Sequence, residues 1–342
     1  MRSEVFTINP ESILPYLRSG GWAGLRDEIR VRELGGGVSN IVLLVEWRDR
    51  PARRWVVKQS LGKLRVQDDW RSERSRIYRE AEAIQALRPI LGAASLPEVV
   101  HVDRENFLFV MTAAPAGSVT WKESLLAGEV DLRVSRQAGT LLGRMINASR
   151  ADKQLQERFT DRTVFDQLRV DPYYRTIAKR HPDVRGQVVQ LMANSWNVQT
   201  ALVHGDYSPK NLLVRDGNIF LIDFEVIHWG DPAFDAAFML NHLLLKTLYQ
   251  PRFAAVYLDA VREFWRALMG EARDTASRGF EALTIRHLGA QMLARIDGKS
   301  PVEYIREEET KERVRAVAKR ILREQPQRLE SALQIVKLNI EG

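Results

Sequence analysis

The stretch HGDYSPKN (204–211) places an acid, Asp206, and an amide, Asn211, on one short segment between two apolar runs. Gly, Asp, Ser, Pro and Asn are common turn residues, so a simple turn is one explanation. A further apolar run ends at Asp223, which is followed by Glu225. Mg²⁺ typically takes one or two protein oxygens and completes its shell with phosphates and water. The spacing predicts phosphoryl transfer, with Asp206 at the accepting hydroxyl. The predicted metal ligands are Asn211, Asp223 and Glu225.

Phosphoryl transfer also requires groups that hold the phosphates, and the first third of the chain offers them. The segment LGGGVSN (34–40) lies between two predicted strands, where bare backbone N–H groups can approach phosphates. Lys58 stands inside a short apolar strand that would not otherwise need a cation. A helical acid should hold it, and of the two acids in RIYREAEAI we choose Glu80 over Glu82. The predicted nucleotide-binding residues here are Gly35, Gly36, Gly37, Ser39, Lys58 and Glu80.

Apolar periodicity predicts the elements that position these residues, and the fold class is α+β. Strands are expected at 31–34, 41–47, 55–59, 99–102 and 107–111, with a helix from 71 to 87 ahead of Pro89. Beyond the connector TAAPAG the pattern is mostly helical, apart from strands around ALVHGD and LLVRDGNIFLIDFE, where Asp216-Gly217 predicts a hairpin turn. The expected lobes are a nucleotide-binding lobe with a small antiparallel sheet (1–112) and a larger helical lobe that binds the acceptor (113–342).

Composition narrows the function class. The 342 residues are 45% hydrophobic and 28% charged, which suits a globular protein with a core. There is no cysteine, so disulfides and thiolate metal sites are excluded. No apolar run is long enough to cross a membrane and none resembles a signal peptide, so we expect no membrane association and a cytoplasmic location. The net charge is +7, but the densest basic run (311–328) contains acids and helical apolar spacing. It therefore predicts a solvated helix face rather than a nucleic-acid site.

These motifs resemble those of the aminoglycoside phosphotransferase and choline kinase family, the small-molecule relatives of protein kinases. The matching positions are His204, Gly205, Asp206 and Asn211 for HGDxxxxN; Ile222, Asp223 and Glu225 for IDxE; and Gly230, Asp231, Pro232 and Asp235 for GDPxxD. Protein kinases would instead have Arg before the catalytic Asp and DFG at the metal strand. The resemblance covers about 31 to 240 and implies a protein-kinase-like two-lobed fold. It also implies ATP and Mg²⁺, with the adenine bound by the backbone at Thr112, Ala113 and Ala114.

Within that family, three features are similar to the methylthioribose kinases. They are the VKQ strand followed by a loop with Trp70, the DxE form of the metal motif, and the segment ARIDG (294–298). In those enzymes, paired arginines at the last segment meet the sugar. Ala294 takes the first of these positions, so only Arg295 carries over as a substrate-binding residue. The loop also departs from the HGDLHTG form of those enzymes because it has a plain Asn211.

The acceptor is expected to be a small molecule with a hydroxyl group. Residues 232 to 342 contain 18 Lys and Arg and 15 Asp and Glu. This part of the chain therefore lacks the excess of acids that would favour binding of a polycationic aminoglycoside. A neutral or anionic polyol fits better, and a methylthioribose-like sugar is the best single choice. A choline-type acceptor would need an aromatic cage, for which Tyr173, Tyr174 and Trp229 are candidates. A nucleotide-binding pseudokinase and a protein-directed kinase are the remaining alternatives.

Several motif residues also have structural explanations. His204 fits a bracing role in the loop as well as a catalytic one. Asp231, ahead of Pro232, is a natural helix cap, and Asp235 can brace the loop. The segment LRVDPYYR (168–175) can line an acceptor pocket, although aromatic packing between helices is the more common use of such a segment.

Overall fold

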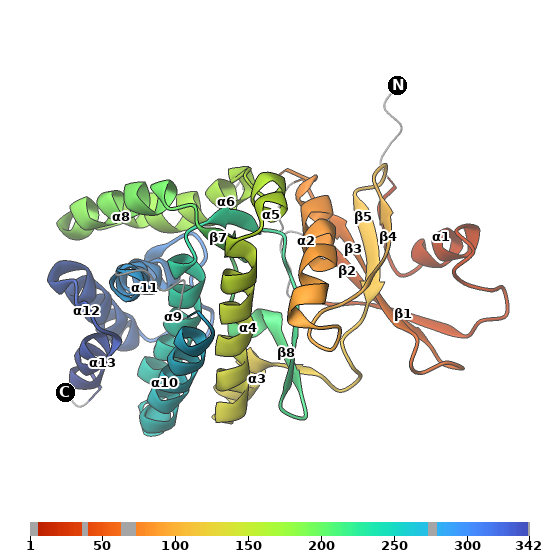
Figure 1. Cartoon of the computed structure of the whole chain (residues 1–342). Helices are drawn as coiled ribbons and strands as arrows, with labels where there is room; N and C mark the ends of the chain where they lie inside the picture. The colour runs from red at the N-terminus through yellow and green to blue at the C-terminus, as the bar shows by residue number, and fades with distance from the viewer. Residues whose placement is uncertain (1–5, 36–39, 63–72, 273–278, 341–342) are drawn as a thin grey trace. The chain divides into compact units, whose positions relative to one another are not determined.

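The computed structural model describes residues 6–35, 40–62, 73–272 and 279–340. The chain divides into two compact units, Met1–Ala116 and Gly117–Gly342 (Figure 1). The division follows Ala116, whereas the predicted boundary followed residue 112. Within the described residues, no helix is long and apolar enough to cross a membrane.

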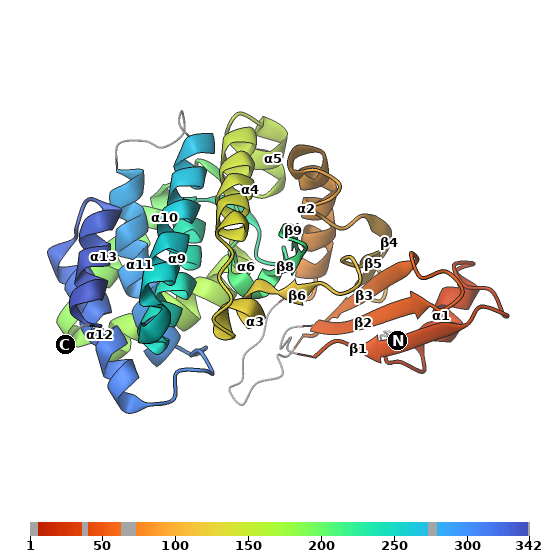
Figure 2. The ribbon, with the colours of Figure 1, turned by 90° about the horizontal axis from the view of Figure 1, so that it is seen from below.

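The first unit is built on a five-stranded antiparallel sheet in the order β1-β2-β3-β5-β4, whose central strands lie side by side in Figure 2. Its strands are β1 (Ile29–Glu33), β2 (Asn40–Trp47), β3 (Arg54–Ser60), β4 (Val99–Asp103) and β5 (Leu108–Thr112). All five predicted strands are therefore confirmed. Lys58 on β3 lies opposite Val42 of β2 and Phe109 of β5, so it stands in the middle of the sheet.

Two helices accompany this sheet. The core that contains Leu43, Val57 and Val110 also includes Ile13 and Leu17 of α1 (Ile13–Ser19). Helix α2 (Arg76–Leu91) packs against β3, β4 and β5. The residues predicted to share its apolar face, Ile77, Ala81, Ile84 and Leu87, are all buried.

Helix α2 differs from its predicted range of 71–87 at both ends, since it begins at Arg76. It continues through Pro89 to Leu91, although the sequence pattern suggested that the helix would end before the proline. Proline removes one backbone donor and clashes with the preceding turn when it lies inside a helix. Pro89 lies in the last turn, where few intrahelical bonds remain to be lost, so the helix tolerates it.

The second unit is mostly helical. Its longer helices are α4 (Leu132–Arg150), α8 (Arg185–Asn197), α9 (Ala233–Tyr249), α10 (Ala254–Glu271), α11 (Phe280–Asp297), α12 (Glu308–Glu324) and α13 (Leu329–Leu338). The shorter ones are α3 (Trp121–Leu126), α5 (Lys153–Arg158), α6 (Thr163–Phe165), α7 (Thr176–Arg180), and the 3₁₀ turns η2 (Pro182–Val184), η3 (Pro209–Asn211) and η4 (Pro251–Phe253). A π-helix, η1 (Asp166–Arg175), precedes α7.

Helix α9 is the centre of this unit, because every residue from Ala233 to Leu248 is buried. Helices α10 and α11 pack along it, and α10 also packs along α4. A Cβ atom at Gly139 of α4 would lie 2.2 Å from the carbonyl oxygen of Phe264 in α10. The close approach of these two helices therefore requires a glycine at this position.

Five short strands hold the candidate catalytic loop. They are β6 (Val119–Thr120), β7 (Ala201–Val203), β8 (Leu212–Arg215), β9 (Asn218–Leu221) and β10 (His228–Gly230). Strand β7 pairs with β10 ahead of the loop, and β8 leaves the loop to pair with β6 and β9. Asp216 and Gly217 join β8 to β9 with φ angles of 51° and 76°, the conformation of a two-residue hairpin turn. The predicted turn is thus confirmed.

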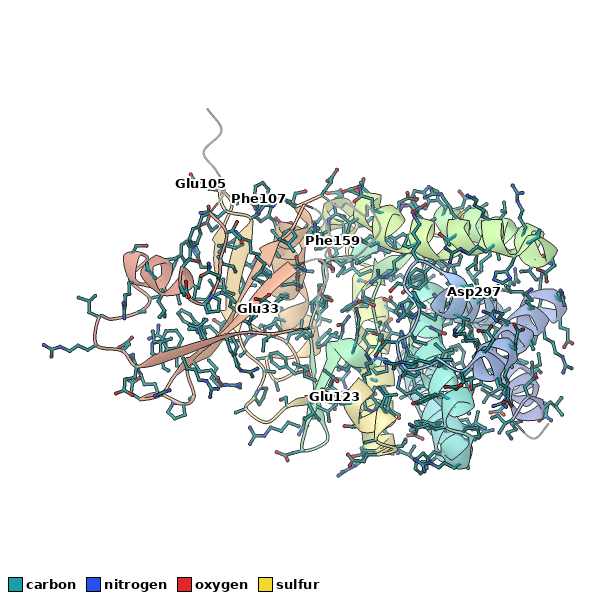
Figure 3. The ribbon with its side chains drawn as sticks, turned by 180° about the vertical axis from the view of Figure 1, so that it is seen from behind. Glu33, Glu105, Phe107, Glu123, Phe159 and Asp297 are labelled. Atoms are coloured by element: carbon teal, nitrogen blue, oxygen red, sulfur yellow. The ribbon has the colours of Figure 1, made fainter. Side chains whose placement is uncertain are left out.

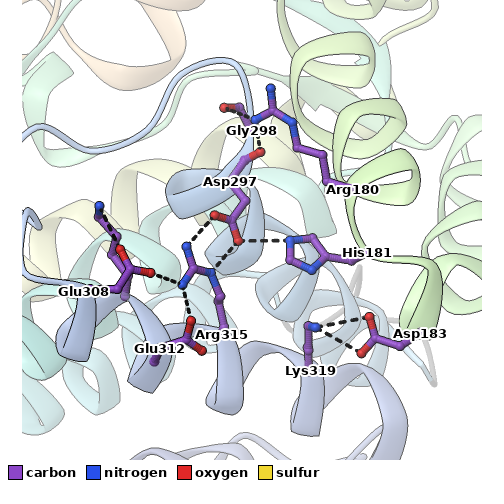
Figure 4. A network of polar contacts seen from close by, with 10 residues as sticks. Arg180, His181, Asp183, Asp297, Gly298, Glu308, Glu312, Arg315 and Lys319 are labelled. Atoms are coloured by element: carbon purple, nitrogen blue, oxygen red, sulfur yellow. Dashed lines mark hydrogen bonds and ion pairs between the residues drawn. The ribbon is translucent and has the colours of Figure 1, made fainter.

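Two sets of side-chain contacts stabilise helix ends in the second unit. Helix α3 begins with a capping box, in which Glu123 (labelled in Figure 3) accepts from the backbone N–H of Thr120 and donates its own N–H to the Thr120 hydroxyl. Figure 4 shows how the end of α11 is tied to α12. Asp297 accepts two bonds of 2.8 Å from Arg315 and one of 3.0 Å from His181. The basic run 311–328 is thus helical as far as Glu324, and several of its cations pair with acids.

Candidate active site

In the first unit, Lys58 and Glu80 form a buried ion pair. The Lys58 Nζ lies 2.7 Å from Oε2 and 2.9 Å from Oε1 of Glu80. The two residues are 5% and 0% exposed, so the pair is held in a region that largely excludes water. Glu82 instead pairs with Arg104 on the surface. The choice of Glu80 over Glu82 as the partner of Lys58 is therefore confirmed, while the contact of Lys58 with a nucleotide stays a prediction.

The other predicted nucleotide-binding residues lie in two stretches of the first unit, 35–39 and 112–114. Gly36, Gly37 and Ser39 lie outside the described residues, as does Trp70. Gly35 follows β1, and a Cβ atom there would meet nothing within 4 Å, so packing does not explain this glycine.

The stretch predicted to bind adenine begins at the end of β5. The Ala113 N–H donates to the Arg54 carbonyl at 2.9 Å, and the Arg54 guanidinium donates to the Ala114 carbonyl at 2.6 Å. The Thr112 hydroxyl accepts the backbone N–H of Glu98. The Thr112 N–H also donates to the Glu98 carbonyl, so Arg54 and Glu98 already use four polar groups of this stretch, and a purine would have to bond to the others or displace one of these two residues.

In the second unit, Asp235 of α9 braces the loop 204–211. Its two carboxylate oxygens accept the backbone N–H groups of His204 at 2.5 Å and Gly205 at 2.9 Å. Burial raises the pKa of Asp235 to about 7, and these two backbone bonds oppose the rise. The bracing role predicted for Asp235 is confirmed.

His204 and Gly205 shape the start of the loop. Burial lowers the pKa of His204 to about 4, so the ring is neutral near pH 7. Its Nδ1 accepts from the N–H of Asp206, which leaves the proton on Nε2 to be donated to the Ile222 carbonyl at 3.2 Å. Gly205 has a φ of 77°, and a Cβ atom there would lie 2.7 Å from Val226. The histidine therefore braces the loop, and only glycine fits after it.

Asp206 is a buried carboxylate between two cations. Its Oδ2 lies 3.1 Å from the Arg169 guanidinium and 2.7 Å from the Lys210 ammonium. Burial by itself would raise the pKa of Asp206, but the charges of Arg169 and then Lys210 outweigh it and lower the pKa overall. Asp206 is therefore ionised at neutral pH and can accept a hydrogen bond from a hydroxyl group.

Arg169 is the candidate-site residue that sequence reasoning missed, and it pairs with Asp206. It is 8% exposed, its Nε donates to the Gly205 carbonyl at 2.6 Å, and it comes from the π-helix η1. π-helical turns often occur at functional sites. The sequence signal for Arg169 was a charged residue between two apolar ones, Leu168 and Val170, shortly before Pro172. The packing role predicted for this segment also holds, since Tyr173 and Tyr174 are buried.

Asn211 and Asp223 lie close to the same loop. The Asn211 Nδ2 donates to the Asp206 carbonyl at 2.9 Å, and among the described residues no hydrogen bond uses its Oδ1. The Asn211 carbonyl accepts the N–H of Ile222, which places the start of the Asp223 turn beside it. Asp223 has a φ of 70°, an uncommon conformation that costs energy in residues other than glycine. Such strain points to a functional constraint on where this carboxylate lies.

The predicted metal ligands pass a test of donor chemistry. Within the described residues, no group of three or more His, Cys, Asp or Glu side chains could hold a metal alone. Asn211, Asp223 and the buried Glu225 instead offer an amide oxygen and two carboxylates. The charges of Glu225 and Asp223 both act on Arg169, so they share its surroundings. Oxygen donors in this number suit Mg²⁺, which retains positions for phosphates and water.

Two further predicted residues lie in the helical unit. Asp231 was predicted to cap α9; the N-cap is instead Pro232, and Asp231 just before it accepts the N–H of Ala233 at 3.0 Å, while its other oxygen lies 3.1 Å from His287. Arg295 of α11 donates to the Tyr173 hydroxyl at 3.0 Å and to Ser300.

The fold and these motifs agree with a match to a family model. The model described as the phosphotransferase enzyme family covers residues 30–274. The chain belongs to this family. Its loop motif, metal motif and bracing Asp235 all fall inside the matched range.

Curated relatives of this phosphotransferase-family chain include several kinases. Methylthioribose kinase 2 of Oryza sativa subsp. japonica is 26% identical over 250 residues, which cover 65% of this chain and 58% of the relative. Methylthioribose kinase of Escherichia coli O45:K1 is 26% identical over 262 residues, covering 68% and 61%. The 4-hydroxytryptamine kinase of Psilocybe cyanescens is 23% identical and covers 59% and 64%. The chain thus spans less than two thirds of the length of these relatives.

Solved structures of the same kind share the fold. The amicoumacin kinase hAmiN, described in complex with AMP-PNP and Ca²⁺, has a TM-score of 0.59 at 15% identity and covers 94% of this chain and 95% of its own. A choline kinase from Cryptosporidium parvum Iowa II has a TM-score of 0.53 at 14% identity, with 97% and 95% covered. The predicted protein-kinase-like α+β fold is confirmed.

Proposed function

We propose that this protein transfers the γ-phosphate of Mg·ATP to a hydroxyl group of a small molecule. The observation that carries the proposal is the loop 204–211, where a buried, ionised Asp206 and an Asn211 amide are fixed on one braced turn. The strained Asp223 beside this turn supports a metal role for that acid. The relatives' names support a kinase, and the AMP-PNP complex of a structural neighbour supports ATP as the donor.

Asp206 would orient the acceptor. Its lowered pKa makes it a weak base, so it accepts a hydrogen bond from the hydroxyl and fixes the direction of attack. Phosphoryl transfer passes through a loose transition state that needs little early proton removal. A weakly basic carboxylate is therefore sufficient, and catalysis would come mainly from positioning and charge stabilisation.

The remaining residues would hold the donor. Lys58, kept in place by Glu80, would contact the α- and β-phosphates, with the segment 35–39 beside them. Asn211, Asp223 and Glu225 would hold Mg²⁺, which when bound neutralises charge on the phosphates. Thr112, Ala113 and Ala114 would lie against the adenine.

The acceptor is proposed to be a sugar-like polyol, and a methylthioribose-like sugar is the best match among the curated relatives. Arg295, with Tyr173 and Ser300 as partners, would contact it. The two cationic alternatives fit less well. The Tyr173 ring lies 5.8 Å from the Arg169 guanidinium and 5.9 Å from that of Arg295, so it already has cations for partners. A choline or aminoglycoside cation would meet repulsion there.

The test is acceptor-dependent ADP release from Mg·ATP over a panel of pentoses, methylthioribose, choline and aminoglycosides. Asp206→Asn should abolish turnover on the best acceptor. Asp216→Asn is the matched control, because it is an exposed hairpin acid and Asn-Gly forms the same turn. Mg·ATP binding without turnover of any acceptor would favour the pseudokinase alternative. No Mg·ATP binding by a folded protein would refute the proposal.

A further inference from the structure

Lys246 is a buried lysine that the proposed chemistry does not use. It lies near the end of α9, is 0% exposed, and donates to the carbonyl oxygen of His242 at 3.1 Å. Its Nζ also lies 5.2 Å from the centre of the Tyr304 ring. In the part of the chain that the structure describes, no carboxylate forms an ion pair with it. Buried lysines usually have such a partner, so its absence requires an explanation.

Two cations and one acid act on Lys246. Burial lowers the pKa of Lys246, and the charges of Lys122 and Arg295 lower it further. The charge of Glu303 acts in the opposite direction, but this acid is already paired with Lys122. The local charge is therefore positive before any ligand is counted.

His242, one turn earlier on α9, is also affected by nearby positive charges. Burial lowers its pKa well below the usual value, and four nearby cations lower it further. These cations are Arg295, Lys246, Lys210 and Lys122. The cluster thus extends from Lys246 to Lys210, which pairs with Asp206.

Two polar atoms of the cluster are also unsatisfied. The Nε of Arg295 and the hydroxyl of Tyr304 are buried, and among the described residues neither has a hydrogen-bond partner. A buried donor without a partner costs free energy, and each such group in a native protein needs an explanation. Both are donors, so an oxygen-rich anion would satisfy them and balance the charge of Lys246.

Side-chain contacts connect this cluster to Asp206. The Arg169 guanidinium pairs with Asp206 and lies 5.7 Å from the Phe238 ring and 5.8 Å from the Tyr173 ring. Phe238 in turn contacts the ring of His242, with 5.3 Å between centroids, and Tyr173 accepts a hydrogen bond from Arg295. Arg169, Phe238 and Tyr173 therefore link the carboxylate of Asp206 to the basic cluster through direct side-chain contacts.

We infer that the acceptor carries an anionic group, a carboxylate or a phosphate, which Lys246, Arg295 and Tyr304 bind while a hydroxyl of the same molecule faces Asp206. This inference rests on the proposed function and narrows its acceptor from polyols in general to acidic ones. It departs from the neutral sugar suggested by the relatives. Lys246 and Tyr304 are assigned to substrate specificity, not to the transfer step.

The experiment compares matched acceptors: glycerate with glycerol, ribonate with ribose, gluconate with glucose, and each with the corresponding sugar phosphate. Affinity is measured by calorimetry without nucleotide, and turnover by ADP release. The best acid should bind about tenfold or more tightly than its neutral partner. Near pH 8, its binding should take up a proton, because the anion raises the pKa of a lysine that is mostly neutral before binding. Carboxylates and phosphates are told apart by which series binds more tightly.

Three variants test the assignment. Lys246→Met should remove the preference for the acid and the proton uptake, while affinity for the neutral partner stays the same. Tyr304→Phe, which removes only the hydroxyl, should weaken the acid several-fold and not the neutral partner. Lys153→Met, on the exposed face of α5, should change neither affinity.

Equal affinity for acids and neutral partners, or a preference that survives Lys246→Met, would overturn the inference. Turnover of neutral polyols without any preference for acids would do so too, and would leave the kinase proposal intact. If Mg·ATP does not bind, the kinase proposal fails, and the nucleotide-free calorimetry still decides whether the basic cluster is an anion site.

Discussion

Replacing Lys246 by methionine should stabilise the protein. Methionine keeps an unbranched apolar stem of similar length and adapts well to a buried position. It removes the ammonium group, which has no ion-pair partner among the described residues and is repelled by Lys122 and Arg295. The gain would come at the expense of the anion site inferred above, since functional sites often reduce stability.

The magnitude follows from the pKa of Lys246. Burial, aided by Lys122 and Arg295, lowers this pKa from 10.5 to about 7. At about 1.4 kcal/mol for each pH unit, burying the group costs on the order of 4 kcal/mol at neutral pH relative to the unfolded chain. The variant also loses the bond to the His242 carbonyl, worth about 1 kcal/mol. A net gain on the order of 2–3 kcal/mol in the free energy of unfolding is therefore expected.

The pH dependence gives the sharper test. Between about pH 7 and 10.5 the unfolded chain binds a proton on Lys246 that the native protein does not, so the stability contributed by this residue rises with pH. The advantage of Lys246→Met should be largest at or below about pH 7 and should shrink as the pH approaches 10.5.

Urea unfolding of the wild type, Lys246→Met and Lys153→Met at several pH values within this window measures the effect. Lys153→Met controls for the general loss of a lysine, because its side chain is exposed. A variant no more stable than the wild type at neutral pH, or a difference that does not change with pH, would refute the description of Lys246 as a buried cation that no described carboxylate pairs with.

Three other substitutions have expected outcomes. Glu80→Gln removes the charge that balances buried Lys58, so the free energy of unfolding should fall by about 3–5 kcal/mol and Mg·ATP binding should weaken; unchanged values in denaturation and calorimetry would contradict the pair's importance. Gly205→Ala places a Cβ atom 2.7 Å from Val226 at a φ of 77°, so turnover should be lost in a protein whose circular dichroism is retained, and normal activity would show that the loop can move aside. Asp235→Asn can no longer accept both loop N–H groups. Because the pKa of Asp235 is raised, its contribution to stability falls as pH rises from about 4 to 7. The variant should lose this pH dependence in thermal unfolding, and a dependence that persists would belong to another group.

Much of the fold could be predicted because its determinants are local. The strands of the first unit have short apolar runs, and the face of α2 repeats at helical spacing. The Asp216-Gly217 turn needs only two residues that tolerate positive φ. The pairing of Lys58 with Glu80 was also accessible, because a cation inside an apolar strand is costly without an acid beside it. The end of α2 could not be predicted in this way, because a helix tolerates a proline such as Pro89 in its last turn, and the sequence does not show where that turn lies.

The sequence alone determined which residues carry the candidate chemistry. The spacing of Asp206 and Asn211, and the acids that end the following strand, identify a phosphotransferase motif whatever the surrounding packing. His204 and Asp235 belong to the family motifs, and their bracing roles were predicted from the sequence.

Only the tertiary structure decided what surrounds that chemistry. Arg169 reaches Asp206 from a π-helix distant in sequence, and Lys246 meets Arg295 and Tyr304 through the packing of α9 against α11 and the segment that follows. The physical reason is that burial and the charges of distant segments set both ionisation and hydrogen-bond satisfaction. A lysine within an apolar helix has no distinctive spacing in the sequence. It becomes a candidate anion site only because the fold brings the charges of Lys122 and Arg295 near it and gives it no ion-pair partner among the described residues.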